Sequence, residues 1–231
     1  MKARAAAITE VLKEIEDGIV IGYGSGTTVT QLLPELKKLI ERENLRLKFI
    51  PSSLQSRELL ISYNLELVTL DEIPDPDLVI DSFDQADYEG NVIKGGGGAL
   101  LREKILAQAA KKVVYLGDYL KLREVLNFPI PIEILQYSYS HVRRVLEAWN
   151  MRLRPRSCGA KMGPIISDNG NILADVEAGE IRDPEGLHEK LRSISGILET
   201  GIFIKPADLI VIGYPDGSIK RIEVARKKLI P

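Results

Sequence analysis

Glu103 is the residue whose surroundings most directly suggest proton-transfer chemistry. At roughly 100° per residue, a helix predicted over residues 99–110 places it on a face that is otherwise apolar. That face holds Ala99, Leu100, Leu106, Ala107 and Ala110, with Arg102 and Lys104 well to either side. Burial disfavours the charged form of a carboxylate, which suits a general base working near neutral pH. The competing interpretation is a surface glutamate paired with a basic neighbour.

The segment directly before that helix could stabilise negative charge on a reacting oxygen. It consists of Lys94 followed by Gly95, Gly96, Gly97 and Gly98. Backbone amides that pack beside a lysine can hold an oxyanion. Four consecutive glycines are equally typical of a flexible linker, so both interpretations stay open at this point.

A second glycine-rich segment, Gly22-Tyr-Gly-Ser-Gly-Thr-Thr28, lies between a predicted strand and a predicted helix. Its glycines let backbone N–H groups approach an anion, and Ser25, Thr27 and Thr28 add hydroxyl donors at the positive end of the helix. The pattern G-x-G-x-G is neither a P-loop nor the dinucleotide fingerprint. We predict a phosphate cradle, with a tight turn that binds no ligand as the alternative.

Two carboxylates and one more lysine follow other predicted strands. Asp81 and Asp84 lie three residues apart and could bind sugar hydroxyls or move protons, although caps of a turn are the simpler interpretation. Lys121 follows the next predicted strand. Neither His141 nor His188 belongs to these loops, so we expect no metal site that contains histidine.

Strand and helix signals alternate through the first 128 residues. We predict strands over 19–23, 47–50, 66–70, 78–83 and 113–117, and helices over 8–15, from 28 to 40 with a kink at Pro34, over 53–62 and over 99–110. This α/β alternation is typical of a mostly parallel sheet that helices cover on both faces. Ligands bind beyond the carboxyl ends of such strands, so the candidate residues should meet at one edge.

The pattern changes at Phe128-Pro-Ile-Pro131, which resembles a passage between domains. We then predict a strand at 132–136, a helix at 141–149, two strands that meet in a hairpin turn at 168–171, a helix at 187–194 and a strand at 197–204. The basic run 152–156 is expected to be a solvated strand. We therefore predict a small α+β domain at 131–206, inserted into a domain of 1–130 plus 207–231. Strands at 209–213 and 219–224 could return to the sheet of the larger domain.

Composition excludes several classes of function. The 231 residues are 45% hydrophobic and 28% charged, as in soluble globular proteins. A net charge of −2 gives no global electrostatic reason to bind nucleic acid or membrane. No run of 18 apolar residues and no signal peptide are present, so the cytoplasm is expected, which the single Cys158 fits.

Together, these motifs resemble those of type A ribose-5-phosphate isomerases over nearly the whole chain. The matching segments are 21–29, 52–57, 91–105, 163–164, 167–171, 196–201 and 207–208. The resemblance implies a Rossmann-like domain with a small ferredoxin-like domain, a homodimer or homotetramer, and no metal or organic cofactor. It also implies interconversion of ribose 5-phosphate and ribulose 5-phosphate through an enediolate, as in the non-oxidative pentose phosphate pathway.

The resemblance implies that Glu103 accepts the proton, with Asp81, Asp84 and Lys94 as further catalytic residues. The implied substrate-binding residues are Ser25, Gly26, Thr27, Thr28, Ser82, Phe83, Gly95, Gly96, Gly97 and Lys121. One segment departs from the family pattern Asp-Gly-Ala-Asp-Glu, because this chain reads Asp81-Ser-Phe-Asp-Gln85. We expect the bulkier residues to affect the backbone shape of this loop and the substrate preference.

Two other functions fit a related α/β fold. A regulator could bind a sugar phosphate without catalysis, but such proteins also need an element that reads DNA, and no helix-turn-helix extension or basic domain is apparent. An acyl-CoA transferase could use a catalytic glutamate, although such chains are typically longer. A test for CoA binding would distinguish the second alternative.

Overall fold

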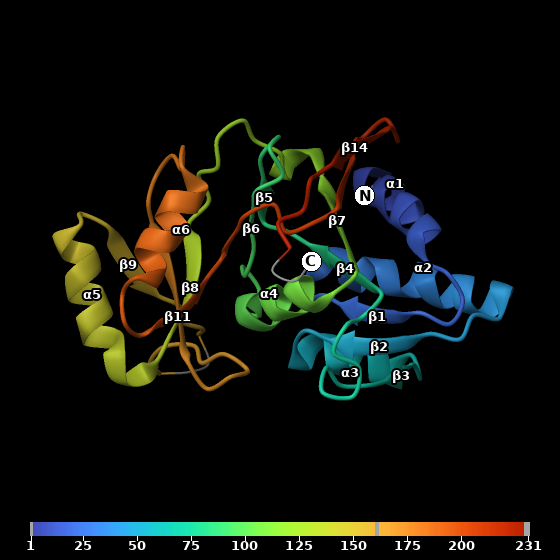
Figure 1. Cartoon of the computed structure of the whole chain (residues 1–231), viewed down its shortest axis with the longest axis horizontal. Coiled ribbons are helices and arrows are strands. Elements are labelled where there is room, and N and C mark those ends of the chain that lie inside the picture. The colour runs from blue at the N-terminus through green and yellow to red at the C-terminus, as the bar shows by residue number, and fades with distance from the viewer. Residues whose placement is uncertain (1, 160–161, 229–231) are drawn as a thin grey trace.

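A seven-stranded sheet forms the centre of the computed structural model, which describes residues 2–159 and 162–228 (Figure 1). Its strands are β1 (Val20–Tyr23), β2 (Lys48–Pro51), β3 (Glu66–Leu67), β4 (Leu78–Ser82), β7 (Lys112–Asp118), β13 (Leu209–Gly213) and β14 (Ile219–Glu223). The order is β14-β13-β7-β4-β1-β2-β3, and every neighbouring pair is parallel except β13 and β14. The predicted mostly parallel α/β sheet is therefore confirmed.

Helices cover both faces of this sheet. The first face packs against α1 (Lys2–Val11), α2 (Thr27–Glu43) and α3 (Leu54–Ser62), and the second face packs against α4 (Leu100–Ala109). A short 3₁₀ turn, η1 (Leu12–Glu14), follows α1. The second helix continues through Pro34. A capping box of Ser53 and Ser56 starts α3, because each side chain bonds the backbone N–H of the other residue.

The central strands are buried along their whole length, which explains where their polar residues lie. In β4, Leu78 and Ile80 pack beneath α1, α2 and α3, whereas Val79 packs toward α4. A strand that is covered on both faces reads as a continuous apolar run. The acidic side chains of β4 and β7 therefore lie at the carboxyl ends, Asp81 in β4 and Asp118 in β7.

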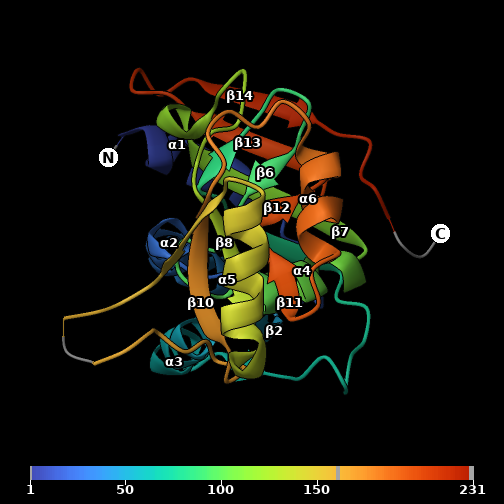
Figure 2. The ribbon, with the colours of Figure 1, turned by 90° about the vertical axis from the view of Figure 1, so that its left-hand side faces the viewer.

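A separate antiparallel sheet lies beside the large one (Figure 2). Its order is β11-β8-β10-β9, formed by β8 (Ile130–Ile134), β9 (Arg152–Pro155), β10 (Ile172–Glu177) and β11 (Ile197–Thr200). It is accompanied by η3 (Gln136–Ser138), α5 (Tyr139–Ala148) and α6 (Pro184–Arg192), and the two helices share an apolar core with the sheet. This grouping supports a small α+β domain, while the bounds 131–206 stay a prediction.

The strand predicted over 197–204 is wrong, because the chain changes sheets within it. β11 ends at Thr200, and β12 (Ile202–Phe203) joins β6 (Val92–Ile93) and β5 (Gln85–Ala86) in a third sheet of order β12-β6-β5. Gly201 stands at the change. A Cβ atom there would lie 2.2 Å from the backbone oxygen of Lys94, so only glycine lets the two backbones approach so closely.

The predicted hairpin turn at 168–171 is present, but the strand before it is reduced to one bridge. The N–H of Ser167 donates to the carbonyl of Asn171 at 2.8 Å, and Ile166 forms an isolated bridge with Ile172. β10 pairs instead with β9, which lies earlier in the sequence. The buried carboxylate of Glu133 explains the local shape, because it accepts from the side chains of Ser167, Asn169 and Asn171.

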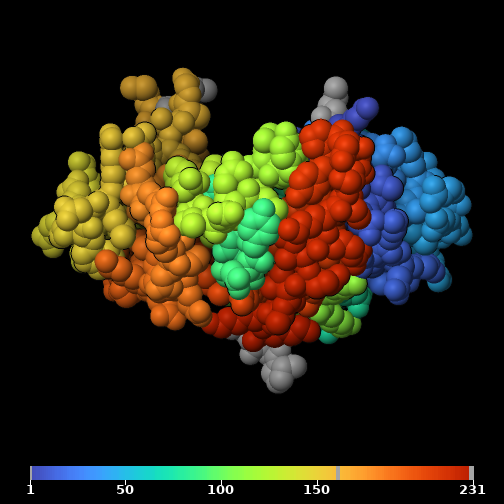
Figure 3. Space-filling view, turned by 90° about the horizontal axis from the view of Figure 1, so that it is seen from above, coloured from blue at the N-terminus to red at the C-terminus, as the bar shows by residue number. Residues whose placement is uncertain are grey.

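The end of the chain closes the larger unit. In Figure 3 the red C-terminal segment lies between the blue N-terminal segments and the orange and yellow segments of the smaller sheet.

Within the described residues, no helix combines the length and the apolar character that a membrane crossing needs.

Candidate active site

Four loops surround a cavity of about 290 Å³ at the carboxyl edge of the large sheet. Three of them follow β1, β4 and β7 of that sheet, and the loop after β7 contains η2 (Tyr119–Lys121). The fourth loop follows β6 of the third sheet. The cavity is lined by Ser25, Gly26, Thr27, Ser82, Phe83, Asp84, Lys94, Gly95, Gly96, Gly97, Glu103 and Lys121. All of these residues were predicted from the sequence. Two further predicted residues, Asp81 and Thr28, are buried and lie behind this lining.

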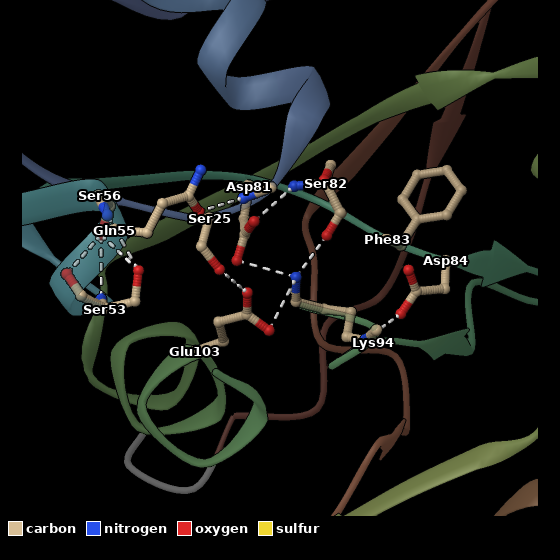
Figure 4. Close-up of polar contacts among 12 residues, drawn as sticks. Ser25, Ser53, Gln55, Ser56, Asp81, Ser82, Phe83, Asp84, Lys94 and Glu103 are labelled. Atoms are coloured by element: carbon tan, nitrogen blue, oxygen red, sulfur yellow. Dashed lines mark hydrogen bonds and ion pairs between the residues drawn. The ribbon is translucent and has the colours of Figure 1, made fainter. Parts of the chain in front are cut away.

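Glu103 lies in the first turn of α4, where the glycine-rich loop enters the helix. Its Oε1 accepts a hydrogen bond from Oγ of Ser25 at 2.6 Å, and its Oε2 is 3.3 Å from Nζ of Lys94 (Figure 4). Only 5% of Glu103 is exposed, so the apolar face predicted from the helix period is buried as expected.

Lys94 joins the two carboxylates at the back of the cavity. Its Nζ lies 2.9 Å from Oδ2 of Asp81 and donates to the carbonyl of Ser82. Burial alone would disfavour the ammonium, but the charges of Asp81 and Glu103 outweigh it and raise the pKa of Lys94. Lys94 therefore remains a cation beside the carboxylate of Glu103.

Asp81 occupies the end of β4 and is only 1% exposed. Burial, followed by repulsion from Glu103, raises the pKa of Asp81 to about 7, against the opposing attraction of Lys94. Its Oδ1 also accepts the backbone N–H of Ser82 at 2.7 Å. The close packing of Gly24 against this carboxyl leaves no room for a larger residue, since a Cβ there would lie 2.0 Å from it.

The run of glycines after Lys94 is a fixed loop and not a flexible linker. The N–H of Gly96 donates to Oδ2 of Asp84 at 2.7 Å. The carbonyls of Gly95 and Gly96 both accept from Nη1 of Arg156, at 2.8 and 3.1 Å. Arg156 in turn pairs with Asp175 at 2.6 Å. The prediction of a solvated basic strand is thus wrong for Arg156, and no local sequence signal relates it to a loop sixty residues earlier.

The glycine-rich segment 22–28 directs the start of α2 toward the cavity. Gly26 is its N-cap with a φ of 95°, a conformation that favours glycine, and its N–H donates to Oε1 of Gln55 at 3.1 Å. Thr27 begins the helix at the cavity wall. The first N–H groups of a helix have no partner within it and carry a partial positive charge, so this wall favours an anion.

Lys121 reaches the cavity from η2, which follows β7, the neighbour of β4 in the large sheet. Its Nζ donates to the carbonyl of Phe83 and lies 5.7 Å from the centre of that ring. Burial lowers the pKa of Lys121. Within residues 2–159 and 162–228 it forms no ion pair shorter than 4.0 Å, so its charge is available to a ligand.

The unusual residues of the loop after β4 are accommodated by their surroundings. Phe83 is buried against Gly117, where a Cβ atom would come within 2.6 Å of the ring. The amide of Gln85 accepts from the backbone N–H groups of Asn127 and Phe128 and donates to the side chain of Asn127 at 2.7 Å. A carboxylate could not donate this last bond, so Gln85 uses the amide fully.

The side of α4 that carries Lys104 is also buried. The helix period predicts that Lys104 lies to the side of the face of Glu103, and there the residue is only 7% exposed. Its Nζ pairs with Glu199 at 2.8 Å and donates to the carbonyls of Thr200 and Ile202. The second sheet covers this side of α4, which a periodicity calculated for one helix could not reveal.

No group of three or more His, Cys, Asp or Glu side chains is arranged to hold a metal ion anywhere in the described residues. The cavity instead combines ammonium groups, carboxylates, hydroxyls and backbone amides. Such groups can bind an anion and move protons between oxygen and carbon without further help.

Comparison with known proteins agrees with this chemistry. The family model of ribose 5-phosphate isomerase A (phosphoriboisomerase A) matches residues 48–217. Ribose-5-phosphate isomerase A of Archaeoglobus fulgidus is 44% identical over 205 residues, which cover 87% of this chain and 91% of that protein. The protein of the same name from Methanococcus aeolicus is 40% identical over 216 residues and 92% of each chain.

Solved structures extend the similarity to the fold. Ribose 5-phosphate isomerase A of Methanocaldococcus jannaschii superimposes with a TM-score of 0.90 at 35% identity, over 96% of this chain and 98% of that one. A D-ribose-5-phosphate isomerase in complex with phospho-erythronic acid gives 0.91 at 32% identity, with the same coverage. With matching sequence and fold, this chain belongs to the ribose 5-phosphate isomerase A family.

Proposed function

We propose that this protein interconverts D-ribose 5-phosphate and D-ribulose 5-phosphate by proton transfer through an enediolate. The observation that carries the proposal is the buried carboxylate of Glu103, whose Oε2 lies 3.3 Å from the ammonium of Lys94 in the wall of a small cavity. A base beside a cation is the arrangement needed to remove a proton next to a carbonyl and to stabilise the oxyanion that forms.

The substrate phosphate binds to the start of α2 and to Lys121. Both line the same cavity, and neither is neutralised by an ion pair in the described part of the chain. Lys94 is less suitable, because Asp81 and Glu103 already balance its charge. The relative solved with phospho-erythronic acid supports a site that accepts a phosphorylated ligand.

Asp84 moves the hydroxyl proton when the sugar ring opens. It lines the cavity and is fixed by the N–H of Gly96, whereas Asp81 lies behind Lys94 and holds the ammonium in place. The sequence left open whether one or both carboxylates move this proton, and the position of Asp84 favours it for direct contact with substrate.

In the open-chain aldehyde, Glu103 takes the proton from C2. The C2–H electron pair forms a double bond to C1, and the carbonyl electrons move to O1, which becomes an oxyanion beside Lys94. The hydroxyl proton of O2 then passes to O1, which leaves the oxyanion on O2. As the carbonyl forms at C2, the electron pair of the C1–C2 double bond takes back the proton of Glu103 at C1, so the product is an isomer of the substrate and the enzyme is unchanged.

Proton NMR in D2O with ribose 5-phosphate tests the proposal. We expect the wild-type protein to form ribulose 5-phosphate, with deuterium at C1 in the fraction of turnovers in which the proton held by Glu103 exchanges with solvent before it is returned. Because a positioned general base contributes about 10²–10⁴-fold, Glu103→Gln should lose at least about a hundredfold in turnover. Circular dichroism should show that the variant keeps its fold. Near-normal turnover in Glu103→Gln would remove Glu103 from this role, and an inactive wild type would remove the function.

The two alternative functions are less consistent with the site. A regulator that only binds a sugar phosphate has no need for a buried carboxylate with one oxygen left without a hydrogen bond, as in Glu103. An acyl-CoA transferase is tested by CoA binding, which we expect to be absent. The cytoplasmic location and the homodimer or homotetramer implied by the family stay predictions, and light scattering of the purified protein checks the second.

A further inference from the structure

The hydroxyl of Ser25 is directed to the carboxylate of Glu103 and not into open space. It donates to Oε1 at 2.6 Å, and this is its one hydrogen bond in the described part of the chain (Figure 4). Ser25 and Glu103 are 7% and 5% exposed, so water competes little for either atom. A hydroxyl has one proton to donate, and here that proton is given to the proposed base.

The backbone on both sides of Ser25 is fixed. The N–H of Gly24 donates to the carbonyl of Ile80 at 2.9 Å, and Gly24 packs directly against Asp81. On the other side, the N–H of Gly26 donates to the side chain of Gln55 at 3.1 Å. Ser25 is therefore held at a defined distance from α4, as a group that orients another side chain must be.

The second oxygen of Glu103 has different surroundings. Oε2 is buried without a hydrogen-bond donor among the described residues, and the nearest cation is Nζ of Lys94 at 3.3 Å. A buried acceptor without a donor is costly and calls for an explanation. A carboxylate oxygen that must receive a proton from substrate has to be left free in this way.

We infer that Ser25 is a positioning residue for the base: its hydroxyl holds Oε1 of Glu103 so that Oε2 is the atom that receives and returns the substrate proton. The inference rests on the proposed isomerisation, because it assigns a task within that reaction. It replaces the hydrogen bond to phosphate predicted from the sequence for the Ser25 hydroxyl, and it leaves phosphate binding to the start of α2 and to Lys121.

Ser25→Ala tests the inference through kinetics. A hydrogen bond to a charged group contributes enough free energy that Ser25→Ala should lower kcat by about 10- to 100-fold. The KM of this variant should change by less than about twofold. Because a donor favours the ionised form of a carboxylate, the acidic limb of the kcat/KM profile should move to higher pH. Ser25→Thr keeps a hydroxyl and should retain more activity. Ser62→Ala, on the exposed side of α3, is the matched control and should behave as the wild type.

A spectroscopic reading separates this inference from the proposed function. With ¹³C-labelled glutamate, the carboxyl resonance of Glu103 is assigned by its absence in Glu103→Gln, and it should shift in Ser25→Ala at constant pH. An unmoved resonance overturns the inference whether or not the protein isomerises the sugar. A raised KM with unchanged kcat and pH profile also overturns it, since Ser25 would then bind substrate. Failure of the wild type to convert ribose 5-phosphate overturns the proposed function and, with it, the task of Oε2 in proton transfer, whereas a shifted resonance in Ser25→Ala would still show that Ser25 orients the carboxylate of Glu103.

Discussion

Asp81, Lys94 and Glu103 bring two carboxylates and one ammonium together where water hardly reaches. Each is at most 5% exposed, and Lys94 lies 2.9 and 3.3 Å from the two acids. One cation cannot balance both acids fully, and a buried like-charged pair favours one proton between them. Burial and the charge of Glu103 raise the pKa of Asp81 to about 7, so this carboxyl takes up a proton below that pH.

The titration of Asp81 predicts how stability depends on pH. Its folded pKa of about 7 lies above the value of about 3.9 for a free aspartate, so between these values the folded protein holds a proton that the unfolded chain has lost. This contribution to stability is full below about pH 4 and is lost as the pH rises through 7. Asp81→Asn lacks the group and does not lose this contribution. The difference in unfolding free energy between the two proteins should therefore change in favour of the variant from pH 5 to pH 8.

Urea unfolding at the two pH values measures this difference. The exposed Asp71→Asn variant is the control, and it should follow the pH dependence of the wild type. A gap between Asp81→Asn and wild type that stays constant from pH 5 to pH 8 would contradict the assignment of this proton to Asp81.

Sequence patterns revealed single residues better than their pairings. The period of one helix was enough to predict that Glu103 is buried, because the apolar residues that share its face are near it along the chain and such a face packs inward. The ion pair of Asp81 with Lys94 depends on how the chain turns through β5 and β6 between them. The contacts of Arg156 and Lys104 come from a different sheet, so no local pattern contains them.

At the scale of elements, the loop of Lys94 is fixed at its start by backbone contacts. Lys94 donates its N–H to the carbonyl of Gly201 at 2.9 Å, and β12 pairs with β6 directly beyond. The alternation of strands and helices predicted the large sheet, because each helix and strand there follows its own period. It did not predict β5 and β6, whose two residues each carry little pattern, and it placed the residues of β12 in one strand with those of β11.

Gly201→Ala tests the importance of this close approach. A Cβ atom would lie 2.2 Å from the carbonyl oxygen of Lys94 and 2.7 Å from the ring of Pro131, so the backbones must separate. Overpacking of this kind costs about 1–3 kcal/mol, and it should also lower kcat by moving Lys94. Gly159→Ala is the control, because open space surrounds that position. Wild-type unfolding and turnover in Gly201→Ala would show that the loop does not depend on this contact.

In the whole molecule, Lys104 connects the large sheet to the small one. It extends from α4 to Glu199 of β11 and to the carbonyls of Thr200 and Ile202, where the chain passes from one sheet to the other. Burial lowers the pKa of Lys104 to about 8, although Glu199 opposes this shift. Such a buried cation is stabilised only while all of its partners remain in place.

Lys104→Met should therefore weaken the junction between the two sheets. Removal of one partner from a buried ion pair costs about 3 kcal/mol, because the other charge is left without compensation. We expect faster amide hydrogen exchange in β11 and β12, with little change in β13. Lys111→Met, whose lysine is exposed, serves as the control. Unchanged exchange in β11 would show that the junction is held by its apolar contacts instead.

The pairing of β12 with β6 has a consequence for how this chain could be divided. A shortened protein made by deleting residues 131–206 would keep every strand of the large sheet and every residue that lines the cavity. It would nevertheless lose Gly201, whose carbonyl receives the N–H of Lys94, and Arg156, which holds the glycines that follow. The larger unit is therefore not a minimal catalyst with an accessory attached, and engineering of smaller variants would have to rebuild the backbone support of Lys94.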